Sequence, residues 1–409
     1  MATSETFVIV GAGLAGGRTA EALRGQGFGG RLVLLGAEPY RPYERPPLSK
    51  GYLMGSAERD TVFVHPYDWY ADNDVELRSD CVVTGIDRKA HVVTSADAQA
   101  VDYDKLLIAT GATPRRLPIA GADADGVHYL RSLDDSETLR ARLSAISNLV
   151  IIGAGWIGLE VAAAARHAGV AVTVLETAEL PLLRVLGPEI AEVFASLHRE
   201  HGVSLRFKTL TSTITTSGGK VTGVELHDGT SLAADAVLVA VGVEPNVQLA
   251  AEAGLKVDNG IVTDASLRTE DENIFAAGDV ANAWHPLLGR HIRVEHWANA
   301  LNQPATAAAA MLGRDATYSR LPYFYSDQYD LGMEYVGHVE PDGYDQVVVR
   351  GDLGGREFIA FWLTGNRVLA GMNVNIWDVT EPIKALISSG AQVDVAKLTD
   401  PNTPLDEVV

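Results

Sequence analysis

The feature that most constrains the fold is a repeated glycine motif. FVIVGAGLAGG (7–17) returns 142 residues later as LVIIGAGWIGLE (149–160). In each copy, a run of branched apolar residues typical of a buried strand leads into G-x-G-x-x-G and then into a helix-forming segment. The first glycine permits a tight turn, the second lets a pyrophosphate approach the backbone, and the third lets the helix pack on the strand. Two copies therefore predict two dinucleotide sites, each at a helix N-terminus.

Length and composition agree with this interpretation. A chain of 409 residues predicts two to three domains, and 47% hydrophobic residues with 40 glycines suit a well-buried α/β protein. The net charge of −20 argues against a nucleic-acid partner, which needs a basic face. No apolar run is long enough to span a bilayer, and no signal-peptide pattern precedes the first strand. We therefore expect a cytoplasmic protein without a membrane partner.

The segments between and after the motifs complete the predicted fold. The prolines of YRPYERPPLSK (40–50) predict a rigid, irregular loop, and NIFAAGDVAN (273–282) predicts a strand, a turn and the start of a helix. From about residue 318, alternating aromatic-rich runs predict antiparallel strands, followed by one helix near 380–388. The fold class is therefore α/β, with two Rossmann-like dinucleotide-binding domains and a C-terminal α+β domain.

Acidic residues after the second strand of each copy indicate which dinucleotides bind. Glu176 directly follows the strand 171–175, 23 residues after Gly153, where a carboxylate accepts hydrogen bonds from the adenosine ribose. It would repel the 2′-phosphate of NADPH, so NADH is predicted; a solvated loop glutamate is the alternative. Glu38, 27 residues after Gly11, is the corresponding candidate for a second adenine dinucleotide.

The motifs GAGLAG, RPPLSK, IATGATPR, GAGWIGLE, AVGVEPN and AAGDVAN, in this order, resemble those of the flavin-dependent pyridine-nucleotide disulfide oxidoreductases with the glutathione-reductase fold. Within that superfamily the chain looks most like the NADH:ferredoxin reductases of bacterial oxygenase systems, of the putidaredoxin, rhodocoxin and biphenyl-dioxygenase type. The likeness extends to PYFYSDQYDLG (322–332). It implies an FAD domain at 1–111 and 245–318, an NAD domain at 112–244 and a C-terminal domain at 319–409.

The resemblance also implies the residues that bind the two cofactors, and it implies no metal. For FAD these are the following: Gly11, Gly13, Ala15, Gly16, Glu38, Arg45, Lys50, Val83, Thr110, Gly111, Arg131, Asp279 and Trp297. For NAD they are Gly153, Gly155, Ile157, Gly158, Glu160, Glu176, Arg184 and Gly242. Asp279 has a second rationale, because it lies at a predicted strand end where the next helix would face a phosphate; a turn former is the alternative.

Two of these residues are predicted to take part in the chemistry. In the family, a lysine at the place of Lys50 lies beside the flavin, and a glutamate at the place of Glu160 pairs with it and contacts the nicotinamide. A carboxylate keeps a buried lysine charged; the alternative for Glu160 is a first-turn glutamate favoured by the helix dipole. Trp297 is either a flavin contact or a core residue. Tyr323 and Tyr325 stand where relatives often carry tryptophans, which leaves open which aromatic covers the nicotinamide.

The cysteine content restricts the electron acceptor. The single Cys81 lies outside the stretch 45–50, so no C-x-x-x-x-C pair exists and disulfide reduction is excluded. The resemblance implies hydride transfer from NADH to FAD, then single electrons to a [2Fe–2S] ferredoxin that feeds a cytochrome P450 or a ring-hydroxylating dioxygenase. A reductase of rubredoxin or another small acceptor, and an NADH-sensing flavoprotein of the apoptosis-inducing-factor type, are the alternatives. We expect a monomer or weak dimer, with Arg290 and Arg293 as candidate docking cations.

Overall fold

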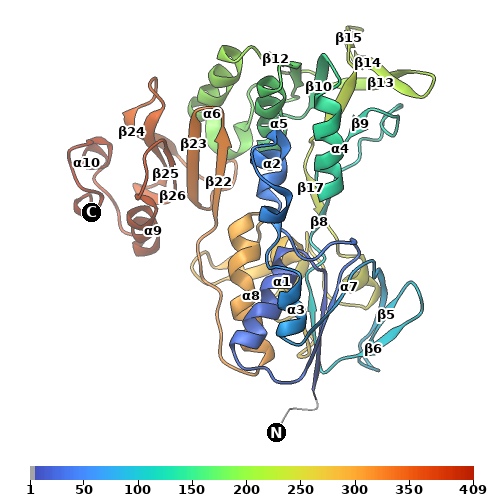
Figure 1. Cartoon of the computed structure of the whole chain (residues 1–409). Helices are drawn as coiled ribbons and strands as arrows, with labels where there is room; N and C mark the ends of the chain where they lie inside the picture. Colours follow the sequence, from blue (N-terminus) through green and yellow to red (C-terminus); the bar gives the residue numbers. More distant parts are fainter. Residues whose placement is uncertain (1–4) are drawn as a thin grey trace. The chain divides into compact units, whose positions relative to one another are not determined.

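The computed structural model describes residues 5–409, which form two compact units (Figure 1). Unit 1 comprises the residues up to Glu44, Arg59–Thr113 and Val243–Pro322. Unit 2 comprises Arg45–Glu58, Pro114–Gly242 and Tyr323–Val409. Over the described residues, the chain passes between the units five times: after Glu44, after Glu58, within β8 (Ala112–Pro114), at the start of β17 (Val243–Pro245) and after Pro322. The boundaries of the three domains expected from the sequence stay a prediction.

Unit 1 is built on a parallel sheet of five strands in the order β19–β7–β1–β2–β3. Phe7 and Ile9 enter one apolar cluster, and Val8 and Val10 enter another, because successive side chains of a strand point to opposite faces. α1 and α8 lie side by side and belong to the first cluster (Figure 1). The bounds are β1 (Thr6–Val10), α1 (Leu14–Gly25), β2 (Arg31–Leu35), β3 (Val75–Arg78), β7 (Lys105–Ile108), β19 (Ile274–Ala276) and α8 (Trp297–Met311).

The rest of unit 1 consists of two small sheets and two short helices, and one expectation for it is wrong. AAGDVAN does not begin a helix: a three-residue 3-10 turn, Gly278–Val280, leads directly into a strand. Gly278 has a left-handed φ of +79°, and its N–H donates to the Gln303 side chain, so the chain turns there. The elements are α3 (Asp68–Asp72), β4 (Val83–Asp87), β5 (Val92–Ser95), β6 (Ala100–Asp102), α7 (Gln248–Glu252), β18 (Ile261–Thr263), β20 (Ala281–His285) and β21 (Arg290–Arg293).

Unit 2 repeats this plan with the strand order β12–β11–β10–β16–β9. The turns match in detail, because the N–H of Gly11 donates to the Leu35 carbonyl and that of Gly153 to the Leu175 carbonyl, both at 2.8 Å. A three-stranded antiparallel sheet follows β3 in unit 1 (β4–β6) and the equivalent strand β12 in unit 2 (β13–β15). The bounds are β9 (Val127–His128), β10 (Asn148–Ile152), α5 (Trp156–His167), β11 (Ala171–Leu175), α6 (Leu183–Glu200), β12 (Ser204–Arg206), β13 (Thr211–Ser217), β14 (Lys220–Leu226), β15 (Ser231–Ala233) and β16 (Ala236–Val239).

The C-terminal part of unit 2 is the expected antiparallel sheet, in the order β22–β23–β26–β25–β24. Its buried face joins one apolar cluster with α5 and α6, which includes Leu159, Phe194 and Trp362 (Figure 1). The predicted helix is α9 (Thr380–Ser389), whereas α10 (Val395–Thr399) was not predicted. The strands are β22 (Tyr323–Gln328), β23 (Leu331–Gly337), β24 (Gln346–Asp352), β25 (Glu357–Thr364) and β26 (Arg367–Val374).

The proline-rich segment is more regular than predicted. Pro46–Ser49 forms a 3-10 helix, and Gly51–Met54 forms α2. Prolines are tolerated in a first turn because their missing N–H has no helical partner there. α4 (Leu133–Leu143) holds this segment, since Ser136 donates to the Leu48 carbonyl at 2.8 Å. Across residues 5–409, none of the helices combines the length and hydrophobicity that crossing a bilayer requires.

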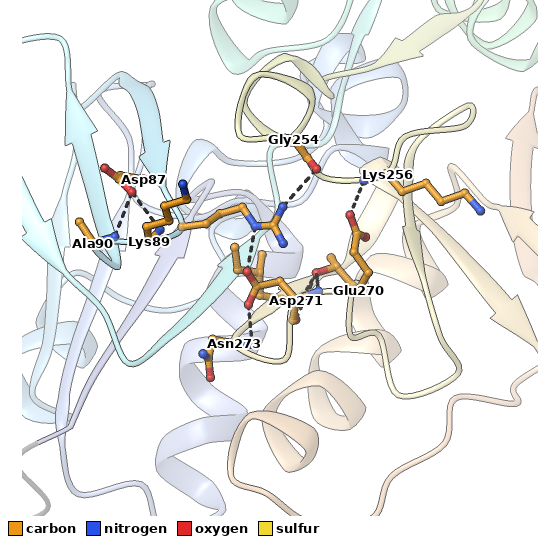
Figure 2. Close-up of polar contacts among 11 residues, drawn as sticks. Asp87, Lys89, Ala90, Gly254, Lys256, Glu270, Asp271 and Asn273 are labelled. Carbon is orange, nitrogen blue, oxygen red and sulfur yellow. Dashed lines mark hydrogen bonds and ion pairs between the residues drawn. The ribbon is translucent and has the colours of Figure 1, made fainter.

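A half-buried ion pair ties the β4–β5 hairpin to the segment 254–273 of unit 1. Arg88 Nε donates to the Asp271 carboxylate at 2.8 Å, and Arg88 Nη1 donates to the Gly254 carbonyl at 3.1 Å (Figure 2). The N–H of Asn273 also donates to Asp271, at 3.0 Å. Burial acts to raise the pKa of Asp271, but the hydrogen bonds from Arg88 and Asn273 outweigh it, so the pKa lies below its ordinary value.

We expect Asp271→Asn to lower the free energy of unfolding by about 1–2 kcal/mol at pH 7, because a charge-assisted hydrogen bond is lost. The lowered pKa means that this stabilisation is complete well above the ordinary aspartate value of about 4 and is lost as the pH falls through the folded pKa. Urea denaturation at pH 7 and pH 3 measures the loss of stability and its dependence on pH. Asp60→Asn is the control, since Asp60 is 91% exposed and 3.7 Å from Arg41; equal losses in the two variants would contradict the assignment.

Candidate functional site

The first glycine motif forms a tight strand-turn-helix junction in unit 1. Gly11 has φ of +112°, and a Cβ there would lie 2.2 Å from the Ala109 carbonyl oxygen. A Cβ on Gly16 would lie 1.9 Å from the Gly11 carbonyl oxygen, so α1 approaches β1 only because that position is glycine. Ala15 is buried in the first turn of α1. The first and third glycines therefore shape the backbone, as the motif predicts.

The second motif repeats this geometry in unit 2. Gly153 has φ of +106°, and its Cβ would lie 2.3 Å from the Ala240 carbonyl oxygen. A Cβ on Gly158 would lie 2.2 Å from the Gly153 carbonyl oxygen. Ile157, between them on α5, is 43% exposed. The two motifs are thus equivalent in backbone as well as in sequence.

The middle glycines show that both turns can accept a ligand. A Cβ on Gly13 or on Gly155 would meet no atom within 4 Å. Each of these glycines is the N-cap of its helix, and neither helix has a side-chain cap. The first turns of α1 and α5 therefore have no side-chain cap for their N–H groups and begin beside an open position, at the positive end of the helix dipole. This arrangement fits the pyrophosphate of a dinucleotide at each turn.

The two candidate ribose ligands lie at the ends of their strands. Glu176 follows β11, and its carboxylate accepts hydrogen bonds from the N–H groups of Ala154 at 2.8 Å and Ala178 at 2.9 Å. These bonds hold the carboxylate directly beside the second glycine turn. Glu38 lies beyond the end of β2 and accepts a hydrogen bond from the hydroxyl of Tyr43.

The other predicted FAD residues of unit 1 come from three places. Thr110 and Gly111 lie just after β7, where the Asn246 side chain donates to the Thr110 carbonyl at 2.8 Å and the Asn246 N–H donates to the Gly111 carbonyl at 2.9 Å. Val83 is the first residue of β4. Asp279 is buried in the 3-10 turn, and Trp297 is the first residue of α8. Asn246, which fixes this turn, was not singled out by the sequence.

In unit 2, Lys50 and Glu160 form the predicted ion pair. Lys50 Nζ lies 2.8 Å from Glu160 Oε1, and the side chains are 14% and 4% exposed. Lys50 connects the 3-10 helix Pro46–Ser49 to α2, and Glu160 lies on the second turn of α5. The pairing and burial argue against a merely solvated glutamate at the helix start, because burying a carboxylate requires a partner.

Two serines that the sequence did not single out complete the environment of Glu160. Ser49 donates its hydroxyl to Glu160 Oε2. Ser326, on β22, donates to Glu160 Oε1 at 2.7 Å. Both hydroxyls are buried, so that with Lys50 the carboxylate has three polar partners from two separate stretches of chain. No local sequence signal distinguishes these serines from other strand or turn serines.

The aromatic residues of β22 have different surroundings. The ring of Tyr325 lies 5.4 Å from Lys50 Nζ, within cation–π range. Tyr323, two residues earlier, donates its hydroxyl to Glu334 at 2.7 Å. Of the two tyrosines, Tyr325 is therefore the one beside the ion pair. Which aromatic covers the nicotinamide stays a prediction.

The remaining predicted residues of unit 2 lie around the same segments. Arg45 donates to the backbone carbonyl of Arg131, so these two predicted FAD residues contact each other. Arg184 is exposed on the first turn of α6. Gly242 has φ of +99°, and its carbonyl accepts the N–H of Arg115 at 2.9 Å.

The structure also bears on the acceptor and on docking. Cys81 is a free, half-buried thiol before β4 in unit 1, away from the segment 45–50 in sequence. Arg293 is only 8% exposed; it pairs with Glu295 at 2.5 Å and donates to the Asp279 carbonyl at 3.3 Å. A guanidinium held in this way is a poor docking cation, so of the two predicted docking arginines only Arg290 stays a candidate.

Comparisons with known proteins identify relatives over the whole chain. The family model described as pyridine nucleotide-disulphide oxidoreductase matches residues 5–304, and the model described as reductase C-terminal matches residues 323–409. Rhodocoxin reductase of Rhodococcus erythropolis is 43% identical over 90% of this chain and 86% of its own. The ferredoxin–NAD(+) reductase component of the anthranilate 1,2-dioxygenase system of Burkholderia cepacia is 43% identical over 98% of this chain and 99% of its own.

A solved structure confirms the fold class. The covalent complex of putidaredoxin reductase with putidaredoxin contains a chain that matches with a TM-score of 0.95 at 41% sequence identity, covering 99% of this chain and 98% of that one. The predicted architecture of two dinucleotide-binding domains and a C-terminal domain is thereby confirmed.

The glycine geometry predicts that one alanine variant loses stability and another loses affinity for FAD. Gly16→Ala forces a backbone clash and should lower the free energy of unfolding by about 2–4 kcal/mol. Gly13→Ala meets no protein atom, so the flavin-free protein should keep its melting temperature while FAD binds about tenfold more weakly, because the methyl group occupies the space of the pyrophosphate. Calorimetry and flavin fluorescence measure the two quantities. Equal destabilisation by both variants would contradict an open ligand position at Gly13.

Proposed function

The chain belongs to the pyridine nucleotide-disulphide oxidoreductase family, and we propose that it is an FAD-dependent NADH:ferredoxin reductase of an oxygenase system. The observation that carries this proposal is the combination of two open dinucleotide turns with a buried lysine–glutamate pair and no cysteine pair. The relatives named above reduce, by their names, rhodocoxin or the ferredoxin of a dioxygenase. A [2Fe–2S] ferredoxin is the acceptor we propose, with a cytochrome P450 or a ring-hydroxylating dioxygenase beyond it.

Different residues of the chain would bind the two cofactors. The turn at Gly13 and the carboxylate of Glu38 would hold FAD, and the turn at Gly155 and the carboxylate of Glu176 would hold NADH. Held in this way, FAD would supply the chemistry that converts a hydride from NADH into single electrons. The remaining contacts are those implied by the family for each cofactor. We also propose a monomer or weak dimer in the cytoplasm.

Lys50 and Glu160 would act on charge and orientation. A lysine beside the flavin stabilises the negative charge that develops when the ring system takes up a hydride. Glu160 supplies the counter-charge of this buried ammonium by pairing with it at 2.8 Å. The Tyr325 ring lies 5.4 Å from the ammonium, where its face would attract the positive charge. In the family, the glutamate also contacts the nicotinamide, which would orient it for transfer.

The decisive experiment is an anaerobic titration of the purified flavoprotein with NADH, followed by mixing with a [2Fe–2S] ferredoxin. Bleaching of the flavin followed by rapid ferredoxin reduction is the expected outcome. Bleaching with ferricyanide reduction but no transfer to any ferredoxin or rubredoxin would favour a different small acceptor. A persistent long-wavelength charge-transfer band without onward transfer to any acceptor would favour an NADH sensor.

The position of Glu176 predicts a preference for NADH. Glu176→Gln keeps an acceptor for the Ala154 N–H but removes the charge that repels a 2′-phosphate. We expect the ratio of kcat/KM for NADH to that for NADPH to fall at least about tenfold, which corresponds to about 1.4 kcal/mol. Glu179→Gln is the matched control, because Glu179 is 67% exposed and pairs with Lys208 on the surface. An unchanged ratio in Glu176→Gln would show that the ribose is bound elsewhere.

A further inference from the structure

A line of hydrogen bonds runs from Glu160 into the interior of unit 2. Ser326 Oγ lies 2.7 Å from Glu160 Oε1 and 3.1 Å from Gln328 Nε2. Gln328 Oε1 lies 2.8 Å from His198 Nε2, and the hydroxyl of Tyr329 lies 3.4 Å from His198 Nδ1. Ser326, Gln328 and His198 are at most 1% exposed. This network connects the ion pair to polar groups that the proposed function does not use.

Strand and helix periodicities place these residues together. Phe324, Ser326 and Gln328 alternate along β22 and share its buried face. On α5, Trp156 and Glu160 are four residues apart, and on α6 Phe194 and His198 have the same spacing, so each pair lies on one face of its helix. Trp156 contacts Phe324 and Phe194, which sets the aromatic layer beside the polar one. The network is therefore part of the packing of β22 on both helices.

The donor and the acceptor of each hydrogen bond in this network follow from the carboxylate of Glu160. A carboxylate only accepts, so the Ser326 hydroxyl must donate to it. That hydroxyl can then only accept from Gln328, which must present its NH₂ group to Ser326 and its carbonyl oxygen to His198. His198 must therefore carry its hydrogen on Nε2. Each donor polarises the next, so the line strengthens the last bond, from Ser326 to Glu160.

The surroundings of His198 agree with a neutral ring that carries its hydrogen on Nε2. Burial lowers the pKa of His198 to about 4, opposed by the hydrogen bond to Gln328 and reinforced by His201. At neutral pH the ring is uncharged and carries one hydrogen. With that hydrogen on Nε2, the Nδ1 atom accepts from the hydroxyl of Tyr329, whose ring stacks on His201 at 3.6 Å.

We propose that Ser326 is a positioning residue for hydride transfer, whose hydroxyl, directed by Gln328 and His198, fixes the Glu160 carboxylate beside Lys50. Of about four acceptor positions on a carboxylate, Lys50, Ser326 and Ser49 use three, which leaves one on Oε2 for a ligand. Without Ser326, a second position opens on Oε1 and the carboxylate is free to turn. The effect of Ser326 on hydride transfer rests on the proposed function, whereas the hydrogen-bond network around Ser326 does not.

The geometry has a direct test that does not involve catalysis. Selective ¹⁵N labelling of histidine and NMR, with the His198 signals assigned by their absence in His198→Gln, report which ring nitrogen carries the hydrogen. The neutral Nε2–H tautomer is the expected result at pH 7. The Nδ1–H tautomer would mean that Gln328 presents its NH₂ to His198, that Ser326 donates to Gln328, and that the proposal is wrong.

The consequence is tested by anaerobic stopped-flow reduction of the flavin. Ser326→Ala should slow reduction at saturating NADH about tenfold, as expected for the loss of one hydrogen bond to a charged group, and change the dissociation constant of NADH less than threefold. Ser326→Thr, which keeps the hydroxyl, should stay within twofold of the wild-type rate. Ser196→Ala is the matched control, because this α6 serine donates to Glu192 at 3.3 Å outside the network.

The outcomes separate this inference from the proposed function. A wild-type rate in Ser326→Ala, or no rescue by threonine when both variants fold, would overturn the positioning role. If NADH reduces the flavin and only the ferredoxin step fails, the proposed acceptor is wrong and Ser326 keeps its role. If NADH does not reduce the flavin at all, the proposed function fails, and the tautomer of His198 still decides whether the network exists.

Discussion

Unit 2 depends on a carboxylate that is almost completely removed from water. Glu160 is 4% exposed, and a buried charge costs several kcal/mol unless a counter-charge and hydrogen bonds compensate for it. The compensation comes from Lys50 and Ser49 in the segment 45–58 and from Ser326 in the C-terminal part of the chain. Because removing one partner of a buried pair typically costs about 3–5 kcal/mol, these segments are held where they meet α5. The contacts of Glu160 therefore both stabilise the packing of unit 2 and position the charged groups of its candidate site.

Both Rossmann-like folds could be predicted because their constraints are local. Gly11 and Gly153 have positive φ values, and the third glycine of each motif faces a carbonyl oxygen that a Cβ would strike. Such requirements act over six residues and therefore appear as a motif. The position of Glu176 is also local, since it follows from the length of one βαβ unit. The motif itself does not indicate the three-stranded antiparallel sheet that follows β3 in unit 1 and β12 in unit 2, because no glycine pattern fixes it.

The remaining parts of the site depend on contacts between distant residues. Ser326 is 166 residues from Glu160, and His198 is 130 residues from Gln328. A serine and a glutamine in a strand, or a histidine in an amphipathic helix, carry no signal until the partner is known. The wrong helix prediction after Gly278 has the same origin, because the following residues form β20 only by pairing with β18 and β21. The strand–turn pattern of NIFAAGDVAN predicts a helix there, whereas pairing with distant strands makes the segment a strand.

The two copies differ where their predicted tasks differ. The position of Glu160 in the second motif corresponds to Arg18 in the first, and Leu159 corresponds to Gly17. Arg18 forms a half-exposed pair with Glu21, and a Cβ on Gly17 would lie 2.7 Å from the Pro42 side chain. The first copy thus uses this face of its helix for close packing of a loop, whereas the second uses it to bury a charge. Because the two turns make equivalent backbone contacts, the difference between the units at this place comes from the side chains on one face of the helix.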